Sequence, residues 1–486
     1  MRLRRGLVVP AVALLLVLAG CSAPVMEADP AGGPGGEVGV PNADFDDPAG
    51  DPLGWEDGYW HNESIDVDQS DGLSDGELRA YVGRGMARVE YLRGREFERR
   101  VPVSAISRAE YRNRSSGGDS SSGPSEYSQW NDQVWEALFV VGESQGSGSA
   151  ISSTRSAAVA GFYSPTDDEI KVITGTPESP TISNTTLIHE LVHALQDQHY
   201  DLTKSKYGGE TQDAQLATDG LVEGDASYIE QRYVERCGAA WECVPTPAPS
   251  GGSGGGGGAG PSNLGIFLTI FQPYSDGPVY VHDLVSTGGW GAVEERFREP
   301  PVSSEQIIHR TSETPTPITY RDRARNGWET FPEQGEDGSD TVGEASMYVM
   351  FWYQARTANA ETIDPRTLGN ADGPYDTYNY DAEPSAGWAN DRLFPYQKEV
   401  DGGEKYGYVW VTEWDTAQDA REFRRAYQAI LDALDAEQRA ENTYVVPEGS
   451  YADAFRVTRS GTRVTIVNGP TVSDLNDIRP RSSQSS

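Results

Sequence analysis

The stretch TLIHELVHALQDQHYDL, residues 186–202, holds three of the six histidines in this 486-residue chain. Apolar residues surround the first two histidines at the spacing of a buried helix, at positions 187, 188, 191, 192 and 195. On a helix, His189 and His193 lie one turn apart on the same face, so both imidazoles can reach one metal ion. Glu190 lies about 100° around the helix, beside that ion. The H-E-x-x-H spacing therefore predicts a metal site with a general base.

The motif has an alternative interpretation, a buried helix whose histidines hydrogen-bond only to backbone. Such a helix would carry two histidines and a glutamate into an apolar core without charge partners, which is costly. We therefore favour the metal site. His199 lies about 240° around the helix from His193, so we expect it to be structural and not a ligand.

A catalytic zinc site needs a third protein ligand and one open position. No third histidine follows at the spacing H-x-x-G-x-x-H, so we expect a carboxylate from a second helix over residues 214–236. Glu223 is the expected ligand because its small neighbours, Gly224 and Ala226, would let two helices approach closely. Glu190 is then the expected general base, which accepts a proton from a metal-bound water.

Two other carboxylates of the second helix are open alternatives. Asp219 lies one turn before Glu223 on the same face, and we expect it to orient a ligating histidine. Asp219 or Asp225 could also take the place of Glu223 as the ligand. The donor that stabilises an oxyanion is not identified; His309, Tyr228 and Tyr348 are candidates, and His309 is expected to be structural.

HELVHALQDQHYDL followed by LVEGDA resembles the metal-binding region of the zincins with a glutamate ligand. More narrowly, it is similar to a family of haloarchaeal surface lipoproteins, a resemblance that PPVSSEQIIHR, SAGWANDR and VWVTEWDTAQDAREF extend over residues 74–470. It implies a zincin-like α+β fold, with an active-site helix after a small antiparallel sheet, additional helices and a C-terminal hairpin. It also implies zinc on His189, His193 and Glu223, and an edge strand, EIKVIT (169–174), that pairs with peptide.

The predicted function is that of a surface-anchored zinc metallopeptidase acting on a peptide or protein substrate. The main alternative is a non-catalytic surface or envelope protein that keeps the zincin-like fold. A solute-binding lipoprotein is a third hypothesis, but it leaves the H-E-x-x-H motif unexplained.

The composition excludes nucleic acid as a partner, because the formal net charge is -36 and the pI is near 4.4, whereas phosphate binding needs a basic face. Only five of the 39 basic residues are lysines, and this balance resembles that of proteins from salt-loving microbes. At molar salt the Debye length falls to about 3 Å, so self-repulsion is screened.

The N-terminus predicts export. A basic start leads into an apolar run that ends in LAGC, which resembles a lipobox. We expect residues 1–21 to be a lipoprotein signal peptide and Cys21 to carry the lipid that anchors the chain to the cell membrane, facing outward at the cell surface. A plain signal peptide cut near Ala23 is the alternative. Residues 22–73 are expected to form an acidic, disordered tether.

The main domain is expected over residues 74–472. Ser74 and Glu77 predict a capping box, and residues 157–164 and 169–174 predict a hairpin. Its other expected features are a Gly-rich insertion at 245–263, a C-terminal hairpin at 455–467 turning at 460–461, and a polar tail at 473–486. Cys237 and Cys243 are expected to form a disulfide outside the cell, with two free thiols as the alternative.

Overall fold

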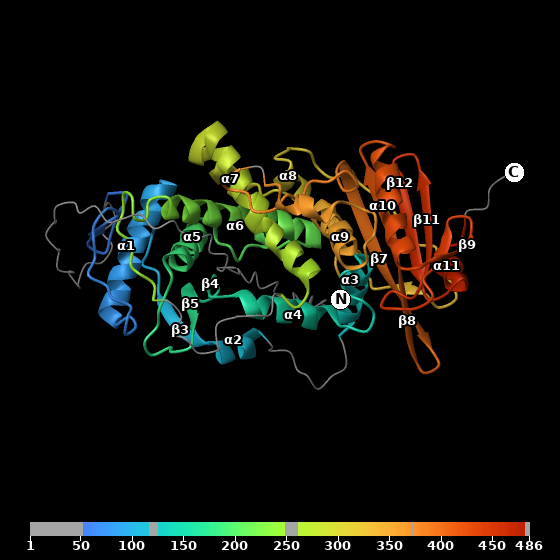
Figure 1. Cartoon of the computed structure of the whole chain (residues 1–486), viewed down its shortest axis with the longest axis horizontal. Helices are drawn as coiled ribbons and strands as arrows, with labels where there is room; N and C mark the ends of the chain where they lie inside the picture. Colours follow the sequence, from blue (N-terminus) through green and yellow to red (C-terminus); the bar gives the residue numbers. More distant parts are fainter. Residues whose placement is uncertain (1–51, 116–124, 248–260, 372, 482–486) are drawn as a thin grey trace, which may run out of the picture.

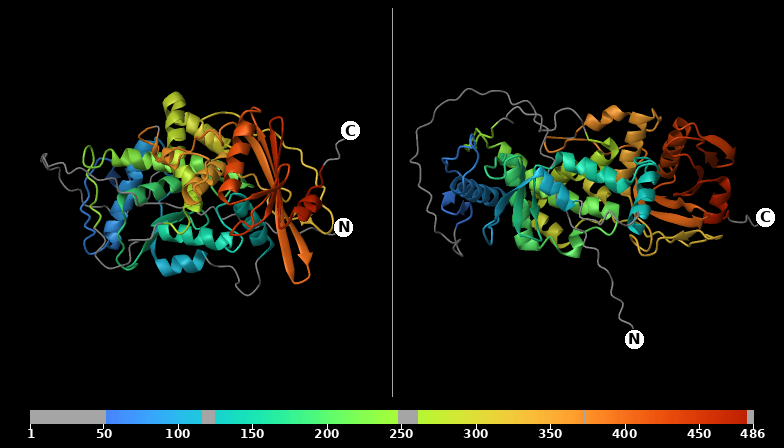
Figure 2. Two further views of the ribbon diagram at one scale, coloured as in Figure 1. Left: turned by 45° about the vertical axis from the view of Figure 1, so that its right-hand side comes forward. Right: turned by 90° about the horizontal axis from the view of Figure 1, so that it is seen from below.

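The computed structural model describes residues 52–115, 125–247, 261–371 and 373–481 and has a mixed α+β fold. Helices occupy one end of the molecule and its centre, and a large sheet occupies the other end (Figure 1). Figure 2 shows the same separation from two further directions. The helices in these residues are α1 (Asp75–Arg93), α2 (Arg108–Ser115), α3 (Glu126–Ala137), α4 (Ser147–Ala158), α5 (Asn184–Tyr200), α6 (Gln212–Val234), α7 (Leu264–Arg298), α8 (Ser304–Ile308), α9 (Gly343–Thr357), α10 (Asp419–Ala433) and α11 (Val472–Ile478).

The strands form three sheets, of two, three and seven strands. They are β1 (Trp55–Glu56), β2 (Tyr59–Trp60), β3 (Val103–Ser107), β4 (Gly161–Ser164), β5 (Glu169–Thr174), β6 (Glu329–Thr330), β7 (Trp388–Val400), β8 (Gly403–Trp414), β9 (Glu437–Ala440), β10 (Thr443–Val445), β11 (Ala454–Ser460) and β12 (Arg463–Gly469). Across the described ranges, no helix is long and apolar enough to span a bilayer.

Helix α1 begins as the sequence predicts, because Ser74 and Glu77 form the capping box. The described part of the expected tether, residues 52–73, differs from that prediction, and its residues 22–51 lie outside the described ranges. From residue 52 onward the chain packs on the helical part, with β1 and β2 paired and Tyr59, Val67 and Leu73 buried. These apolar side chains hold the stretch against α1 and its neighbours, together with hydrogen bonds between Gln69 and the backbone of Ile182. The predicted signal peptide and Cys21 lie outside the described residues.

The small sheet before α5 is mixed, and not antiparallel as the sequence analysis expected. The predicted hairpin is confirmed, since β4 pairs antiparallel with β5. On its other side β5 pairs in parallel with β3. The order β3-β5-β4 makes EIKVIT the central strand, so its expected place at the edge is wrong. The edge strand that contacts α5 is β4.

Helix α7 contains Pro273 and Pro278, and it has a kink at Gly289, with φ 65° and ψ -171°. It packs closely along α6. A Cβ on Gly224 would lie 2.5 Å from the backbone of Gly277. Gly224 was expected to allow the close approach of the two metal-binding helices. In the structure it allows the close approach of α6 and α7 instead.

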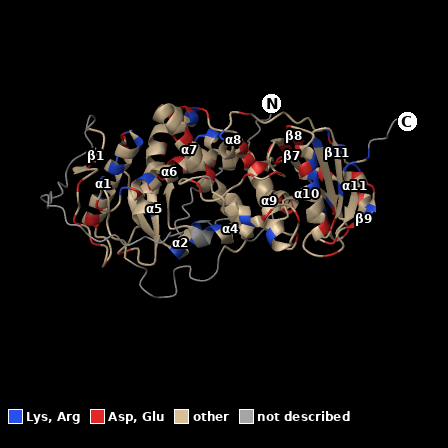
Figure 3. Cartoon of the chain, turned by 45° about the horizontal axis from the view of Figure 1, so that its top comes forward, with Lys and Arg blue, Asp and Glu red and all other residues tan. Residues whose placement is uncertain are grey.

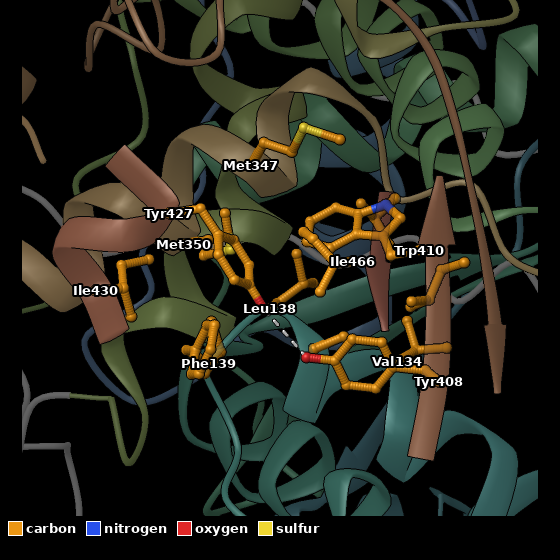
Figure 4. Packing of buried hydrophobic residues seen from close by; sticks show 14 of the residues in the cluster. Val134, Leu138, Phe139, Met347, Met350, Tyr408, Trp410, Tyr427, Ile430 and Ile466 are labelled. Atoms are coloured by element: carbon orange, nitrogen blue, oxygen red, sulfur yellow. Dashed lines mark hydrogen bonds between the residues drawn. The ribbon is translucent and has the colours of Figure 1, made fainter. Parts of the chain in front are cut away.

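The seven-stranded sheet is antiparallel, in the order β6-β7-β8-β12-β11-β10-β9. The predicted C-terminal hairpin is confirmed as β11 and β12. One face of the sheet packs on α3, α9 and α10 through a large apolar core (Figure 4). The other face receives α11, with Leu475 and Ile478 buried. The expected polar tail is thus helical over its first residues, because these two apolar side chains cover the sheet.

Candidate metal centre

The two histidines of the motif lie on α5, at the centre of the helical part (Figure 1). Ser183 caps the helix by accepting a hydrogen bond from the backbone N–H of Thr186. The rings of His189 and His193 are 4.7 Å apart between centroids, as expected for residues one turn apart. Their side chains are 1 % and 0 % exposed, so the helix presents both imidazoles inward.

Glu223 of α6 meets both histidines. Its Oε2 lies 3.1 Å from His189 Nε2 and 3.2 Å from His193 Nε2. One ligand atom from each of the three residues lies within 4.8 Å of the others. The structure therefore brings together the three residues that the sequence analysis expected as ligands. Asp225, an alternative ligand, instead forms a buried salt bridge with Arg93 of α1, a helix along which Figure 3 shows several basic residues.

The hydrogen-bond partners of the two Nδ1 atoms show that each Nδ1 carries a hydrogen. His189 Nδ1 lies 3.0 Å from Glu230 Oε2, and a carboxylate oxygen can only accept there, so this Nδ1 carries a hydrogen. His193 Nδ1 lies 3.0 Å from Gln196 Oε1. The Gln196 Nε2 donates to Val222 O and to Asp225 Oδ2, at 3.0 and 3.2 Å, which orients its oxygen toward the ring.

Both Nε2 atoms therefore face the carboxylate of Glu223, and each can bind a metal ion once it carries no hydrogen. Two imidazole nitrogens and a carboxylate oxygen thus lie close together in a buried region. This arrangement is stable only if a proton or a cation lies among them. The His193 Nε2 is buried and has no aligned hydrogen-bond partner. Burial lowers the pKa of His189, but hydrogen bonds to Glu223 and Glu230 raise it to about 10. The donor set of two imidazoles and a carboxylate fits zinc.

Glu190 lies beside these ligands and is fully buried. Its Oε2 accepts a 2.7 Å hydrogen bond from the backbone N–H of Tyr163, on the edge strand β4. Its Oε1 is buried and has no partner. Burial raises the pKa of Glu190 to about 7, against the lowering effect of His193 and His189. One oxygen is thus fixed by the sheet and the other is left to exchange a proton.

Tyr274 of α7 is a neighbour of the ligands that the sequence analysis missed. Its ring stacks on that of His189, with centroids 6.2 Å apart and an interplanar angle of 20°. Its phenol also hydrogen-bonds to Glu223. No local pattern marks Tyr274, because this contact depends on how α7 crosses α6.

The expected orienting residue, Asp219, accepts a 2.6 Å hydrogen bond from Gln215. The Nδ1 partners of the histidines are Glu230 and Gln196 instead. Gln196 lies one turn after His193 on α5, and Glu230 lies two turns after Glu223 on the same face of α6. These spacings could have identified both residues. His199 bonds to the backbone oxygen of Glu96 at 2.7 Å, which agrees with a structural role.

The three candidates for the oxyanion donor lie in other parts of the structure. His309 hydrogen-bonds to Glu344 at 2.9 Å, Tyr348 packs against Tyr380, and Tyr228 packs against Tyr375. None of the three contacts the ligands among the described interactions. The other predicted pair, Cys237 and Cys243, is joined in a disulfide.

A family model described as a domain of unknown function (DUF8575) matches residues 329–479. No curated protein matches the chain, and no solved structure matches it. The matched segment covers the seven-stranded sheet with α9, α10 and α11. It is less than half of the chain and contains neither α5 nor α6, so the chemistry of the metal centre is argued from its geometry.

Proposed function

We propose that this protein is a zinc-dependent peptidase of the zincin type. The observation that carries the proposal is the convergence of the Nε2 atoms of His189 and His193 on the carboxylate of Glu223. Two imidazoles and one carboxylate, with a position left for water or substrate, are the ligand set of many catalytic zinc sites. Glu230 and Gln196 accept hydrogen bonds from the Nδ1 atoms of the two histidines. They thereby hold the imidazoles in position, as the hydrogen-bond partners of metal ligands do in zinc enzymes.

The chemistry follows from the neighbouring base. When bound, zinc would supply a Lewis acid that polarises a carbonyl and lowers the pKa of water. Glu190 accepts the proton of the attacking water at Oε1 and returns it to the nitrogen of the leaving amine. Its second oxygen stays bonded to Tyr163 N–H, which keeps the carboxylate in one orientation through both transfers.

The proposed setting is the outer face of the cell membrane. The basic start, apolar run and LAGC sequence favour a lipid on Cys21. A net charge of -36 favours a medium rich in salt and excludes nucleic acid as the substrate. A peptide or protein at the cell surface is then the substrate that the site's chemistry and the anchor together favour.

A second candidate is a non-catalytic surface protein in which the metal has a structural role. The burial of the site favours it, since His189, Glu190, His193 and Glu223 are at most 3 % exposed. Structural zinc sites are closed, whereas catalytic sites keep an open position.

The metal content of the purified chain in molar KCl tests the site, and hydrolysis of a denatured protein substrate separates the two candidates. One zinc per chain, lost in His193→Ala, is expected. Chelator-sensitive hydrolysis supports the peptidase. Bound zinc without hydrolysis supports the structural candidate, and no zinc after incubation with excess metal contradicts both.

A further inference from the structure

A second group of carboxylates lies far from α5, where the turn after α3 meets the C-terminal sheet. Glu136 is at the end of α3, Glu143 follows in the next turn, and Asp453 immediately precedes β11. One oxygen from each lies within 4.8 Å of the others. Glu136 and Asp453 are each only 6 % exposed, whereas Glu143 faces solvent. Carboxylates are almost never buried together without a cation or a proton.

The described residues supply no positive charge to this group. None of the three carboxylates forms an ion pair with Lys, Arg or His in that part of the chain, and no basic group is among those that act on their pKa values. Burial raises the pKa of Glu136 well above its ordinary value, and Asp453 and Glu143 raise it further. Burial, with the charge of Glu143, raises the pKa of Asp453 to about 8. The three groups thus destabilise one another when ionised.

A buried carboxamide independently indicates a ligand. Asn468 of β12 is 0 % exposed, and its Nδ2 donates a 2.8 Å hydrogen bond to Asp453 Oδ2. Its Oδ1 is buried without a hydrogen-bond partner. Leaving an amide oxygen buried and unpaired destabilises the folded state. A cation beside Asp453 would satisfy it.

The register of the sheet shows where this carboxamide points. Asn468 is paired with Tyr408 of β8, so both side chains leave the same face of the sheet. Tyr408 belongs to the core that packs on α3, and its hydroxyl meets that of Tyr427 at 3.3 Å (Figure 4). Both Asp453 and Glu136 act electrostatically on Tyr408. Asn468 is therefore directed at the side of the sheet where Glu136 lies.

The loop after α3 and the loop before β11, which carry Glu143 and Asp453, lie in close contact. The backbone N–H of Glu143 donates to Ser450 O at 3.1 Å. A Cβ on Gly142 would lie 2.8 Å from the same oxygen, so only glycine allows this approach. The cluster therefore joins the segment after α3 to the start of β11, two parts of the chain more than three hundred residues apart in sequence.

We propose that Glu136, Glu143, Asp453 and Asn468 form a binding site for a divalent cation of the Ca²⁺ class. All the available donors are oxygens, which Ca²⁺ prefers, and carboxylate and amide oxygens with water can complete its six to eight ligands. The ion would link α3 to the C-terminal sheet and neutralise the buried charge. This proposal is independent of the zinc site and of the peptidase function.

The test uses the full chain in molar KCl, with the histidine site first saturated with zinc. Addition of CaCl2 is expected to raise the Tm in a concentration-dependent manner, since binding to the folded state alone stabilises it. Tb³⁺ is expected to bind in place of Ca²⁺ and to emit when Tyr408 and its aromatic neighbours are excited. The absence of both the Tm rise and the emission overturns the proposal.

Variants locate the site. Glu136→Gln and Asp453→Asn keep the side-chain shapes and are each expected to weaken Ca²⁺ binding at least tenfold. Glu305→Gln is the matched control, because Glu305 is also 6 % exposed and belongs to a different group of three carboxylates; it should leave the affinity unchanged. Should Glu136→Gln fail to fold, the exposed Glu143→Gln replaces it. Affinity that is unchanged in Glu143→Gln and Asp453→Asn, or equally reduced in Glu305→Gln, contradicts the assignment.

Discussion

The Nδ1 of His193 lies 3.0 Å from the Oε1 of Gln196, one turn along the same helix. The amide nitrogen of Gln196 donates to Val222 O and Asp225 Oδ2 on α6. Because Asp225 is in turn paired with Arg93, the orientation of one imidazole depends on contacts among three helices.

Gln196→Leu is expected to weaken zinc binding by about 10- to 100-fold, because it removes the acceptor that holds His193 in its Nδ1–H tautomer, which leaves Nε2 free to bind the metal. A zinc-chelator competition assay measures the change. The control is Gln198→Leu on the same helix, since Gln198 bonds to the backbone of Arg99 and not to a ligand. Equal affinities in the two variants would show that Gln196 does not position the ligand.

Glu190→Gln is expected to retain one zinc per chain and to lose peptidase activity by a factor of about 100 to 10,000, because an amide cannot accept the proton of water. The variant keeps the acceptor for the Tyr163 N–H, so the fold should persist. Metal analysis and hydrolysis of a denatured protein are measured on the same sample. Full activity with bound zinc would exclude Glu190 as the base.

Gly224→Ala is expected to lower the free energy of unfolding by about 1–3 kcal/mol, as overpacked core substitutions do. The new Cβ would lie 2.5 Å from the backbone of Gly277 and would separate α6 from α7. Gly76→Ala in α1 is the control, because a Cβ there meets nothing within 4 Å. A Tm for Gly224→Ala equal to that of the control would mean that α7 can shift without cost.

Asp213 gives the protein a pH-dependent stability. It is buried, and burial raises its pKa from 3.8 to about 7. Between these values the unfolded chain has lost the proton and the folded chain keeps it, so stability falls as the pH rises through this window. We expect a Tm several degrees lower at pH 8 than at pH 5.

Asp213→Asn should reduce this difference, because the amide oxygen still accepts from Ser304 N–H but no longer ionises. Asp283→Asn, on the exposed face of α7, should leave the pH profile as it is. An unchanged profile in Asp213→Asn would assign the effect to other buried carboxyl groups, among them Asp340.

Salt is expected to stabilise the folded chain. With a net charge of -36, self-repulsion acts on the compact state most strongly when the Debye length is long. The Tm should therefore rise between dilute buffer and molar KCl. A Tm that does not change between these conditions would contradict the interpretation of the acidic composition.

The sequence by itself determined the local parts of this protein. The H-E-x-x-H helix, the capping box at Ser74, the β4–β5 hairpin and the C-terminal hairpin all follow from patterns within a few residues, where spacing and side-chain chemistry act directly. Glu223 could also be proposed, because a catalytic zinc site requires a third ligand, but Asp219 and Asp225 of the same helix stayed open until the structure placed Glu223 beside both histidines.

Only the tertiary structure decided the relationships between distant segments. The partners Glu230 and Gln196, the stacking of Tyr274 on His189, the central place of β5 and the carboxylate group around Asp453 depend on which elements lie side by side. Long-range packing sets these neighbours: the Gly224–Gly277 contact brings α7 to the site, and β3 covers the edge that β5 would otherwise expose. Local patterns do not specify such contacts, because they arise from the close packing of side chains from elements far apart in sequence.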